Sequence, residues 1–203
     1  TAGLTANMKK FAKENDKVKV VAHEHITPGD SDFTAVLTKL KRINPDVIYM
    51  STYQPEGSKM IQQVRKLGLE SAFVTEDAVY HPVFLEVGGP AAEGVYLTFA
   101  QAPDTPERQQ FEKTYKAMWK VDAIGSYAYY AYDAGMMALA AIDKAGTAKG
   151  DALQKTIRGN TWSGVTGDIK FDEHGDRKLA HIVWIVKDNQ FVPYWDPMTG
   201  KDL

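Results

Sequence analysis

Two short polar segments carry the residue types best suited to holding a small charged molecule. Thr52 and Tyr53 follow one apolar run of the chain, and Glu76 and Asp77 follow another. A carboxylate takes an ammonium group in a charge-assisted hydrogen bond worth about 1.5–3 kcal/mol. An aromatic ring covers the apolar part of the same molecule and adds about 0.5–2 kcal/mol of cation–π attraction. Together, the two segments suit a small cationic or zwitterionic ligand.

The apolar runs before these segments predict β-strands of an α/β fold. Strands are predicted at 17–26, 47–51, 72–75 and 94–98, and helical stripes of apolar residues at 4–12, 33–43, 60–67 and 82–87. This alternation, with short connections, predicts a parallel sheet with helices on both faces. The carboxyl ends of such strands meet at one edge, where ligands bind. The alternative interpretation, in which Tyr53 packs and Asp77 caps a helix, stays open.

The alternation of strands and helices stops after residue 100, which marks a candidate domain boundary. The loop Pro103–Pro106 precedes predicted helices at 111–119, 126–144 and 150–158 and a strand at 168–171. These helices are too apolar to stand alone in water, and this stretch offers them no sheet to pack on. The last predicted element is a hairpin over 181–193 with its turn at 187–189.

Composition excludes several classes of function. The 203 residues include 24 Lys+Arg and 26 Asp+Glu, a formal net charge of −2, so no nucleic-acid partner is expected. The chain has no Cys, which excludes thiol catalysis, disulfides and cysteine-based zinc sites. No apolar run approaches the roughly 20 residues of a membrane span. No signal peptide is visible, so the sequence is that of a cytosolic or an already processed protein.

Other motifs point away from catalysis and from bound cofactors. The glycines of Gly88–Pro90 lack the spacing of a phosphate-binding loop. His23 and His25 share one face of a predicted strand, but no third metal ligand is near them in sequence. Asp172–Asp176 lacks the acidic spacing of a calcium loop and fits a tight turn better. No serine lies in a nucleophile elbow. We expect neither an enzyme nor a cofactor.

The order and spacing of several segments resemble one known family. They are Thr27–Phe33, Asn44–Asp46, Tyr53–Glu56, Ala92–Tyr96, Ala131–Ala134, Gly164–Asp172, Gly175–Arg177 and Val186–Asp188. In these, the chain resembles the type I periplasmic binding proteins for leucine, isoleucine and valine. The resemblance implies two α/β lobes that close over one ligand about a hinge. It also implies a bacterial periplasmic protein, exported with a signal peptide absent from this chain, that serves an inner-membrane ABC permease.

The resemblance assigns a role to each of the polar residues. Asp77 matches the acidic residue that holds the ligand's ammonium group, and Tyr53 matches an aromatic residue lining the cleft. Thr52 and Glu76 are lesser candidates. Many leucine-type members carry Glu at the acidic position, so which of the two adjacent carboxylates points inward stays open. Aliphatic amino acids, aromatic amino acids, amides and aromatic acids all remain possible ligands.

The resemblance also implies how the chain is divided. Residues 1–100 plus 179–203 would form the second, C-terminal lobe, and residues 101–178 the helical part of the first lobe. Family members carry a further half before the position of residue 1. The resemblance therefore implies that the missing N-terminal half, or a swapped partner chain, covers the apolar helices. The alternative function is a ligand-sensing domain of a receptor or regulator, since fold alone does not separate transport from sensing.

Overall fold

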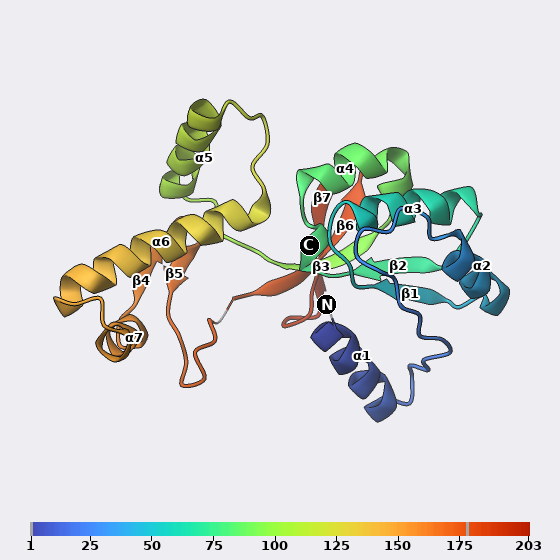
Figure 1. Cartoon of the computed structure of the whole chain (residues 1–203), viewed down its shortest axis with the longest axis horizontal. Helices are drawn as coiled ribbons and strands as arrows, with labels where there is room; N and C mark the ends of the chain where they lie inside the picture. The colour runs from blue at the N-terminus through green and yellow to red at the C-terminus, as the bar shows by residue number, and fades with distance from the viewer. Residues whose placement is uncertain (1, 178) are drawn as a thin grey trace. The chain divides into compact units, whose positions relative to one another are not determined.

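The computed structural model describes residues 2–177 and 179–203, and the chain divides into two compact units (Figure 1). Unit 1 runs to Phe99 and resumes at His181–Leu203, and unit 2 comprises Ala100–Ala180. The chain therefore passes between the units twice. None of the helices among the described residues is long and apolar enough to cross a membrane.

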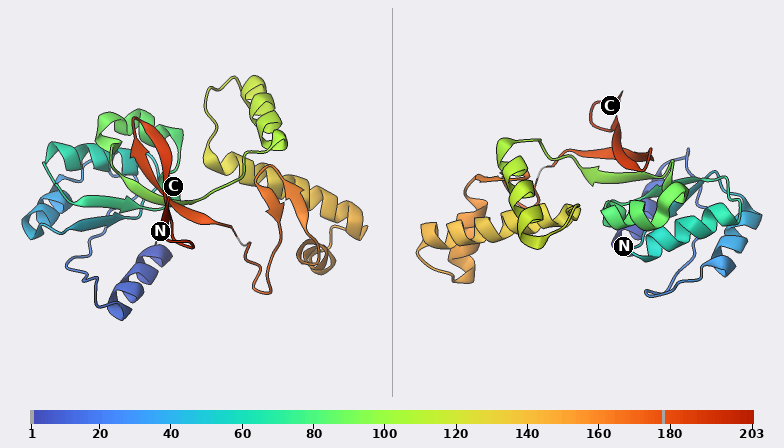
Figure 2. Two further views of the ribbon diagram at one scale, coloured as in Figure 1. Left: turned by 180° about the vertical axis from the view of Figure 1, so that it is seen from behind. Right: turned by 90° about the horizontal axis from the view of Figure 1, so that it is seen from above.

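Unit 1 contains a six-stranded sheet in the order β1-β2-β3-β6-β7-β8. The strands are β1 (Val47–Met50), β2 (Ala72–Thr75), β3 (Tyr96–Ala100), β6 (His181–Lys187), β7 (Gln190–Asp196) and β8 (Lys201–Asp202). The first three are parallel, whereas β6 and β7 form the predicted antiparallel hairpin beside β3 (Figure 2). The hairpin turn places Asp188 and Asn189 at positive φ, which matches the right-handed twist of the paired strands.

The helices of unit 1 cover the sheet unequally. They are α1 (Ala2–Glu14), α2 (Thr34–Ile43), α3 (Glu56–Lys66) and α4 (Pro82–Gly88), with 3-10 turns η1 (Asp77–Val79) and η2 (Gly89–Ala92). Helices α3 and α4 lie side by side over one face (Figure 1). Phe73, Leu97 and Ile61 of α3 are fully buried, and the Arg65 guanidinium of α3 lies over the Phe73 ring at 5.9 Å from its centroid. The other face is less covered, and Val47 is 52% exposed.

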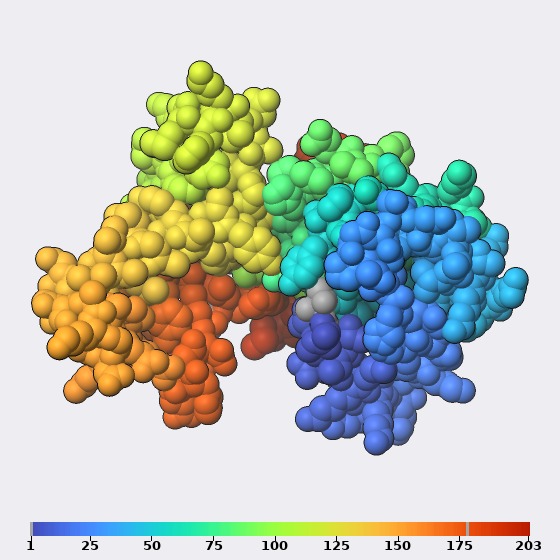
Figure 3. Space-filling view, viewed as in Figure 1, coloured from blue at the N-terminus to red at the C-terminus, as the bar shows by residue number. Residues whose placement is uncertain are grey.

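The predicted strand at 17–26 is wrong. Residues 18–27 adopt no regular structure and pair with no described strand, and β1 is the last strand at that end of the sheet order. Val18, Val20 and Val21 are 41–51% exposed. Alternating apolar residues favour a strand only when a neighbouring strand supplies the hydrogen bonds of the ladder. The space-filling view shows this segment and α1, in dark blue, at the surface of unit 1 (Figure 3).

Unit 2 is mainly helical and has a small core of its own. It contains α5 (Pro106–Trp119), α6 (Ser126–Ala145), α7 (Gly150–Arg158) and a two-stranded antiparallel sheet of β4 (Trp162–Gly164) and β5 (Gly167–Ile169). The core gathers Ile124, Tyr129 and Val165. Much of the apolar surface of α6 lies outside it, with Met136 50% exposed and Leu139 65% exposed.

A buried carboxylate ties the parts of unit 2 together. Asp133 of α6 is 3% exposed and accepts hydrogen bonds from the backbone N–H groups of Val165 and Thr166 at 2.8 and 2.9 Å. The Thr166 hydroxyl also donates to Asp133. The Arg177 guanidinium donates to the Thr166 hydroxyl oxygen at 2.7 Å and to the Asp168 carbonyl at 3.0 Å. Helix α6, the β4–β5 turn and the segment ending at Arg177 are therefore held by one network.

We predict that replacing Asp133 by Ala destabilises the natural protein that carries this sequence by about 2–4 kcal/mol, because two buried N–H groups lose their acceptor. Urea unfolding followed by circular dichroism measures the change. Asp143→Ala is the matched control, since Asp143 lies exposed on the same helix. A loss of stability no larger than that of the control would contradict the proposed importance of the network.

Candidate functional site

The parallel pairing of β1 and β2 brings the two predicted polar segments to the same edge of the sheet. Met50 pairs with Thr75 at the end of the ladder, so Thr52 and Tyr53 leave β1 beside the point where Glu76 leaves β2. This is the carboxyl edge of the parallel strands, where α/β sheets bind ligands. The candidate site is therefore defined here as these two strand ends.

Thr52 and Tyr53 differ in their exposure. The Tyr53 side chain is 63% exposed, so its ring does not act as a packing residue within unit 1. Thr52 is only 6% exposed. Its methyl group lies next to Gly57 of α3, where an added Cβ would come within 3.4 Å of it. Tyr53 thus presents an aromatic surface at the edge, whereas Thr52 belongs to the interior.

Glu76 is a buried carboxyl group at the end of β2. It is 4% exposed, and its Oε2 atom accepts a hydrogen bond of 2.8 Å from the Ala78 backbone N–H, which caps η1. The capping residue is therefore Glu76 and not Asp77. The Oε1 atom is buried and has no hydrogen-bond partner among the described residues. Burial and a hydrogen bond with Asp77 raise the pKa of Glu76 to about 7, against the opposing bond from Ala78.

Asp77 lies beside Glu76 in a more open position. It is partly exposed, is the first residue of η1, and its side chain lies within hydrogen-bonding range of the Glu76 carboxyl group. Two adjacent carboxyl groups with such different access to water differ in how readily they ionise. Asp77 is therefore the better carrier of negative charge at this edge.

Tyr49 is a further member of the site that the sequence did not reveal. Burial and the charge of Glu76 raise the pKa of its phenol, while a hydrogen bond with Ser51 opposes that rise. The hydroxyl group therefore lies close to the carboxyl pair. Within an apolar run, Tyr49 resembles any core residue. The signal that identifies it is alternation, since Tyr49 and Ser51 share a face opposite to Ile48 and Met50.

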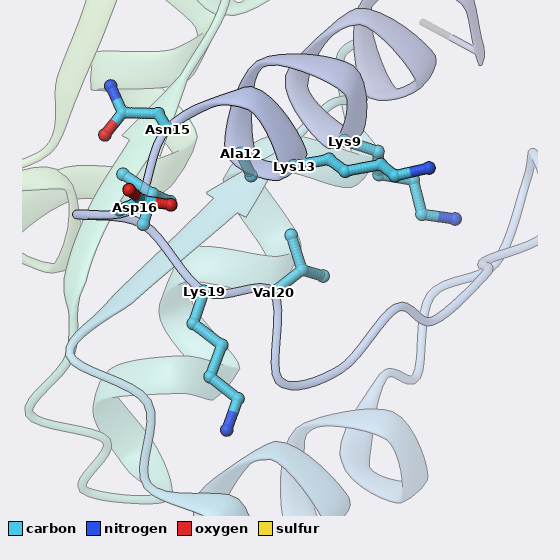
Figure 4. A pocket seen from close by; sticks show the side chains of 8 residues that line it. Lys9, Ala12, Lys13, Asn15, Asp16, Lys19 and Val20 are labelled. Atoms are coloured by element: carbon cyan, nitrogen blue, oxygen red, sulfur yellow. The ribbon is translucent and has the colours of Figure 1, made fainter.

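Unit 1 has two other candidates for a binding site, a surface hollow and a pair of histidines. A hollow of about 430 Å³ lies between α1 and the residues after it (Figure 4). Its lining comprises Lys9, Ala12, Lys13, Asn15, Asp16, Val18, Lys19 and Val20. The rings of His23 and His25 touch edge to face at 4.4 Å between centroids. Across the described ranges, no group of three or more His, Asp or Glu residues is arranged to hold a metal ion.

The suggested calcium loop of unit 2 is a turn, as the better of the two interpretations predicted. The Asp172 carboxylate accepts hydrogen bonds from the backbone N–H groups of His174 and Asp176, both at 2.9 Å. Gly175 adopts a φ of 90°, which only glycine adopts at low cost. The acidic residues of this segment thus serve the backbone of the turn.

Comparison with known proteins gives a consistent match over nearly the whole chain. The family model described as "Periplasmic binding protein" matches residues 1–190. A leucine-, isoleucine-, valine-, threonine- and alanine-binding protein of Pseudomonas aeruginosa is 30% identical over 177 residues. The match covers 87% of this chain and 47% of that protein. The chain therefore spans about half the length of the curated relatives it matches.

Solved structures show the same likeness. A leucine-binding protein of Thermotoga maritima matches with a TM-score of 0.79 and 30% identity, covering 95% of this chain and 55% of that one. The branched-chain amino acid transporter substrate-binding protein of Streptococcus pneumoniae, solved with isoleucine, matches with a TM-score of 0.76 and 24% identity. That match covers 91% of this chain and 53% of the other and supports the fold alone.

The pKa of Glu76 predicts a specific pH dependence of stability. The unfolded chain loses this proton near the ordinary pKa of 4.5, whereas the folded chain keeps it until about pH 7. The stabilising contribution is therefore complete below pH 4.5 and is lost as the pH rises through 7. We expect Glu76→Gln to reduce the fall in unfolding free energy between pH 5 and 8 by roughly 1–3 kcal/mol.

Urea unfolding of the natural protein across this pH range measures the effect. Glu70→Gln is the matched control, because Glu70 is an exposed glutamate of the same unit. If wild type and Glu76→Gln lose stability in parallel, Glu76 does not titrate as described.

Proposed function

The chain belongs to the family of periplasmic binding proteins, and from this premise we propose that it is part of the solute-binding component of an ABC importer. The proposed ligand is a small amino acid or a related metabolite, held in a cleft between two lobes. The observation that carries the proposal is the meeting of Tyr53 and the Glu76–Asp77 pair at the carboxyl edge of β1 and β2.

In this proposal, each site residue contacts a different part of the ligand. Asp77 takes the ammonium group as an ion-paired hydrogen bond, because it is the more accessible carboxylate of the pair. The exposed ring of Tyr53 covers the apolar side chain of the ligand. The named relatives support an aliphatic amino acid as the first candidate. Thr52 has at most an indirect role, since it is buried.

The proposed mechanism is closure about a hinge. A ligand that contacts both lobes favours the closed form by the difference between its affinities for the closed and open forms. The closed form then docks on an inner-membrane permease, which places the protein in the bacterial periplasm after export. The match to the periplasmic binding protein family supports this role.

We further propose that the chain functions together with a segment it does not encode. Residues 1–100 plus 179–203 form the second lobe, and residues 101–178 form the helical part of the first lobe. The missing N-terminal half, or a swapped partner chain, supplies a sheet for α5 and α6. The exposed Met118, Trp119 and Leu139 on these helices support this arrangement, as does the apolar Val47 at the edge of the sheet in unit 1.

The ligand proposal is tested in the natural protein that carries this sequence. A thermal-shift screen with leucine, isoleucine, valine, threonine and alanine is expected to raise the melting temperature for at least one of them, because a ligand bound only by the folded state stabilises it. Asp77→Ala is then expected to weaken calorimetric affinity for that amino acid at least about tenfold. Asp16→Ala, at an exposed position of unit 1, is the control.

An absence of any shift across the five amino acids would contradict the proposed ligand class. Unchanged affinity in Asp77→Ala would remove Asp77 from the site.

The proposed missing half is tested with the 203-residue chain alone. Because its apolar helices lack a cover, we expect size-exclusion chromatography to show self-association, and we expect no cooperative unfolding transition. The natural protein that carries this sequence, run alongside, is expected to elute as a compact species. A stable monomer of the 203-residue chain with cooperative unfolding would count against the proposal.

A further inference from the structure

The two carboxyl groups at the end of β2 lie in unlike surroundings. Glu76 is 4% exposed, and only one of its oxygens, Oε2, has a hydrogen-bond donor, the Ala78 N–H at 2.8 Å. The buried Oε1 has no partner among the described residues. Asp77 is partly exposed, and its side chain lies within hydrogen-bonding range of the Glu76 carboxyl group. The pair is therefore asymmetric in its access to water.

This asymmetry determines which of the two groups carries charge. Two neighbouring carboxyl groups repel each other when both are ionised, so one of them retains a proton over a wide pH range. The group with less access to water retains it, because burial disfavours the charged form. Asp77 is the titratable side chain that raises the pKa of Glu76, and Glu76 in turn raises that of Tyr49; the amino group of residue 1 opposes the rise at Glu76.

A proton on Glu76 would also give the unpartnered Oε1 atom a hydrogen bond to donate. An ionised carboxylate only accepts hydrogen bonds, whereas a protonated one carries an O–H donor. The Asp77 carboxylate is the acceptor within reach, because its side chain lies within hydrogen-bonding range of the Glu76 carboxyl group. Oε2 remains the acceptor for the Ala78 N–H. Each oxygen of Glu76 then has a partner, and Asp77 is held in one orientation.

Building on the proposed function, we propose that Glu76 is a positioning residue, which stays protonated, donates a hydrogen bond to the Asp77 carboxylate and orients that carboxylate toward the ligand's ammonium group. The pair then presents a single negative charge. One negative charge matches a ligand with one cationic group, such as a neutral α-amino acid, better than a diamine or a dibasic amino acid. Glu76 thereby contributes to selection of the ligand class without touching the ligand.

The protonation states are tested directly, without any ligand. Carbon-13 carboxyl resonances of the natural protein are followed by nuclear magnetic resonance from pH 4.5 to 8 and are assigned with Glu76→Gln and Asp77→Asn. At pH 6 we expect a protonated Glu76 and an ionised Asp77. A protonated Asp77 beside an ionised Glu76, or two ionised groups at that pH, would overturn the proposal whether or not the protein is a receptor.

Binding then tests the positioning role. The probe is the amino acid that gives the largest shift in the thermal screen, titrated at pH 6. Glu76→Gln keeps a neutral N–H donor, so its dissociation constant is expected to stay within about threefold of wild type. Glu76→Ala removes the donor and is expected to raise the dissociation constant at least about fivefold. Glu70→Gln is the control.

The outcomes separate this proposal from the proposed function. If wild type binds, Asp77→Ala weakens binding and Glu76→Ala does not, the positioning role fails while the receptor function stands. If wild type binds none of the amino acids, the proposed ligand class fails, and the carboxyl titration still decides the protonation states. Should Glu76→Ala fail to fold, a large loss of affinity in the isosteric Glu76→Gln would itself contradict the proposal.

Discussion

The parallel register of β1 and β2 is the constraint on which the candidate site depends. The ladder pairs Met50 with Thr75, so the two chains leave the sheet at the same level and in the same direction. A shift of one residue in this pairing would move every side chain after it to the opposite face. The buried Phe73 and Ile48 oppose such a shift, because it would expose them to water. The core thus positions the polar edge.

Burial gives two chemically identical groups at that edge different properties. Glu76 and Asp77 are neighbours in sequence and both carry carboxyl groups, yet only Glu76 caps η1 from inside the fold. The cap draws its side chain inward, and Asp77 is left with more access to water. The short 3-10 turn η1 therefore gives the two carboxyl groups different access to water, which their residue types alone do not.

Local signals in the sequence predicted most of the elements that build the site. The apolar runs at 47–51 and 72–75 each end at polar residues, and both became strands of the confirmed α/β fold. The resemblance to periplasmic binding proteins is confirmed by the family match, and the relatives are solute-binding proteins and not enzymes. The prediction of a strand at 17–26 was wrong because a strand needs a neighbouring strand to pair with, and the local sequence does not show whether one is present. Tyr49 was missed because tertiary contacts, and not its neighbours in sequence, place it by the carboxyl pair.

The interruption of unit 1 by unit 2 has a consequence for synthesis on the ribosome. The chain leaves unit 1 at Phe99 and returns only at His181, and the Trp184 indole N–H of β6 donates to the Phe99 carbonyl at 3.2 Å. While residues 100–180 are being translated, the edge of β3 that later pairs with β6 is unpaired. Unit 2, being continuous in sequence, emerges complete before unit 1 does. The nascent chain therefore carries an unprotected strand edge until its last elements are made.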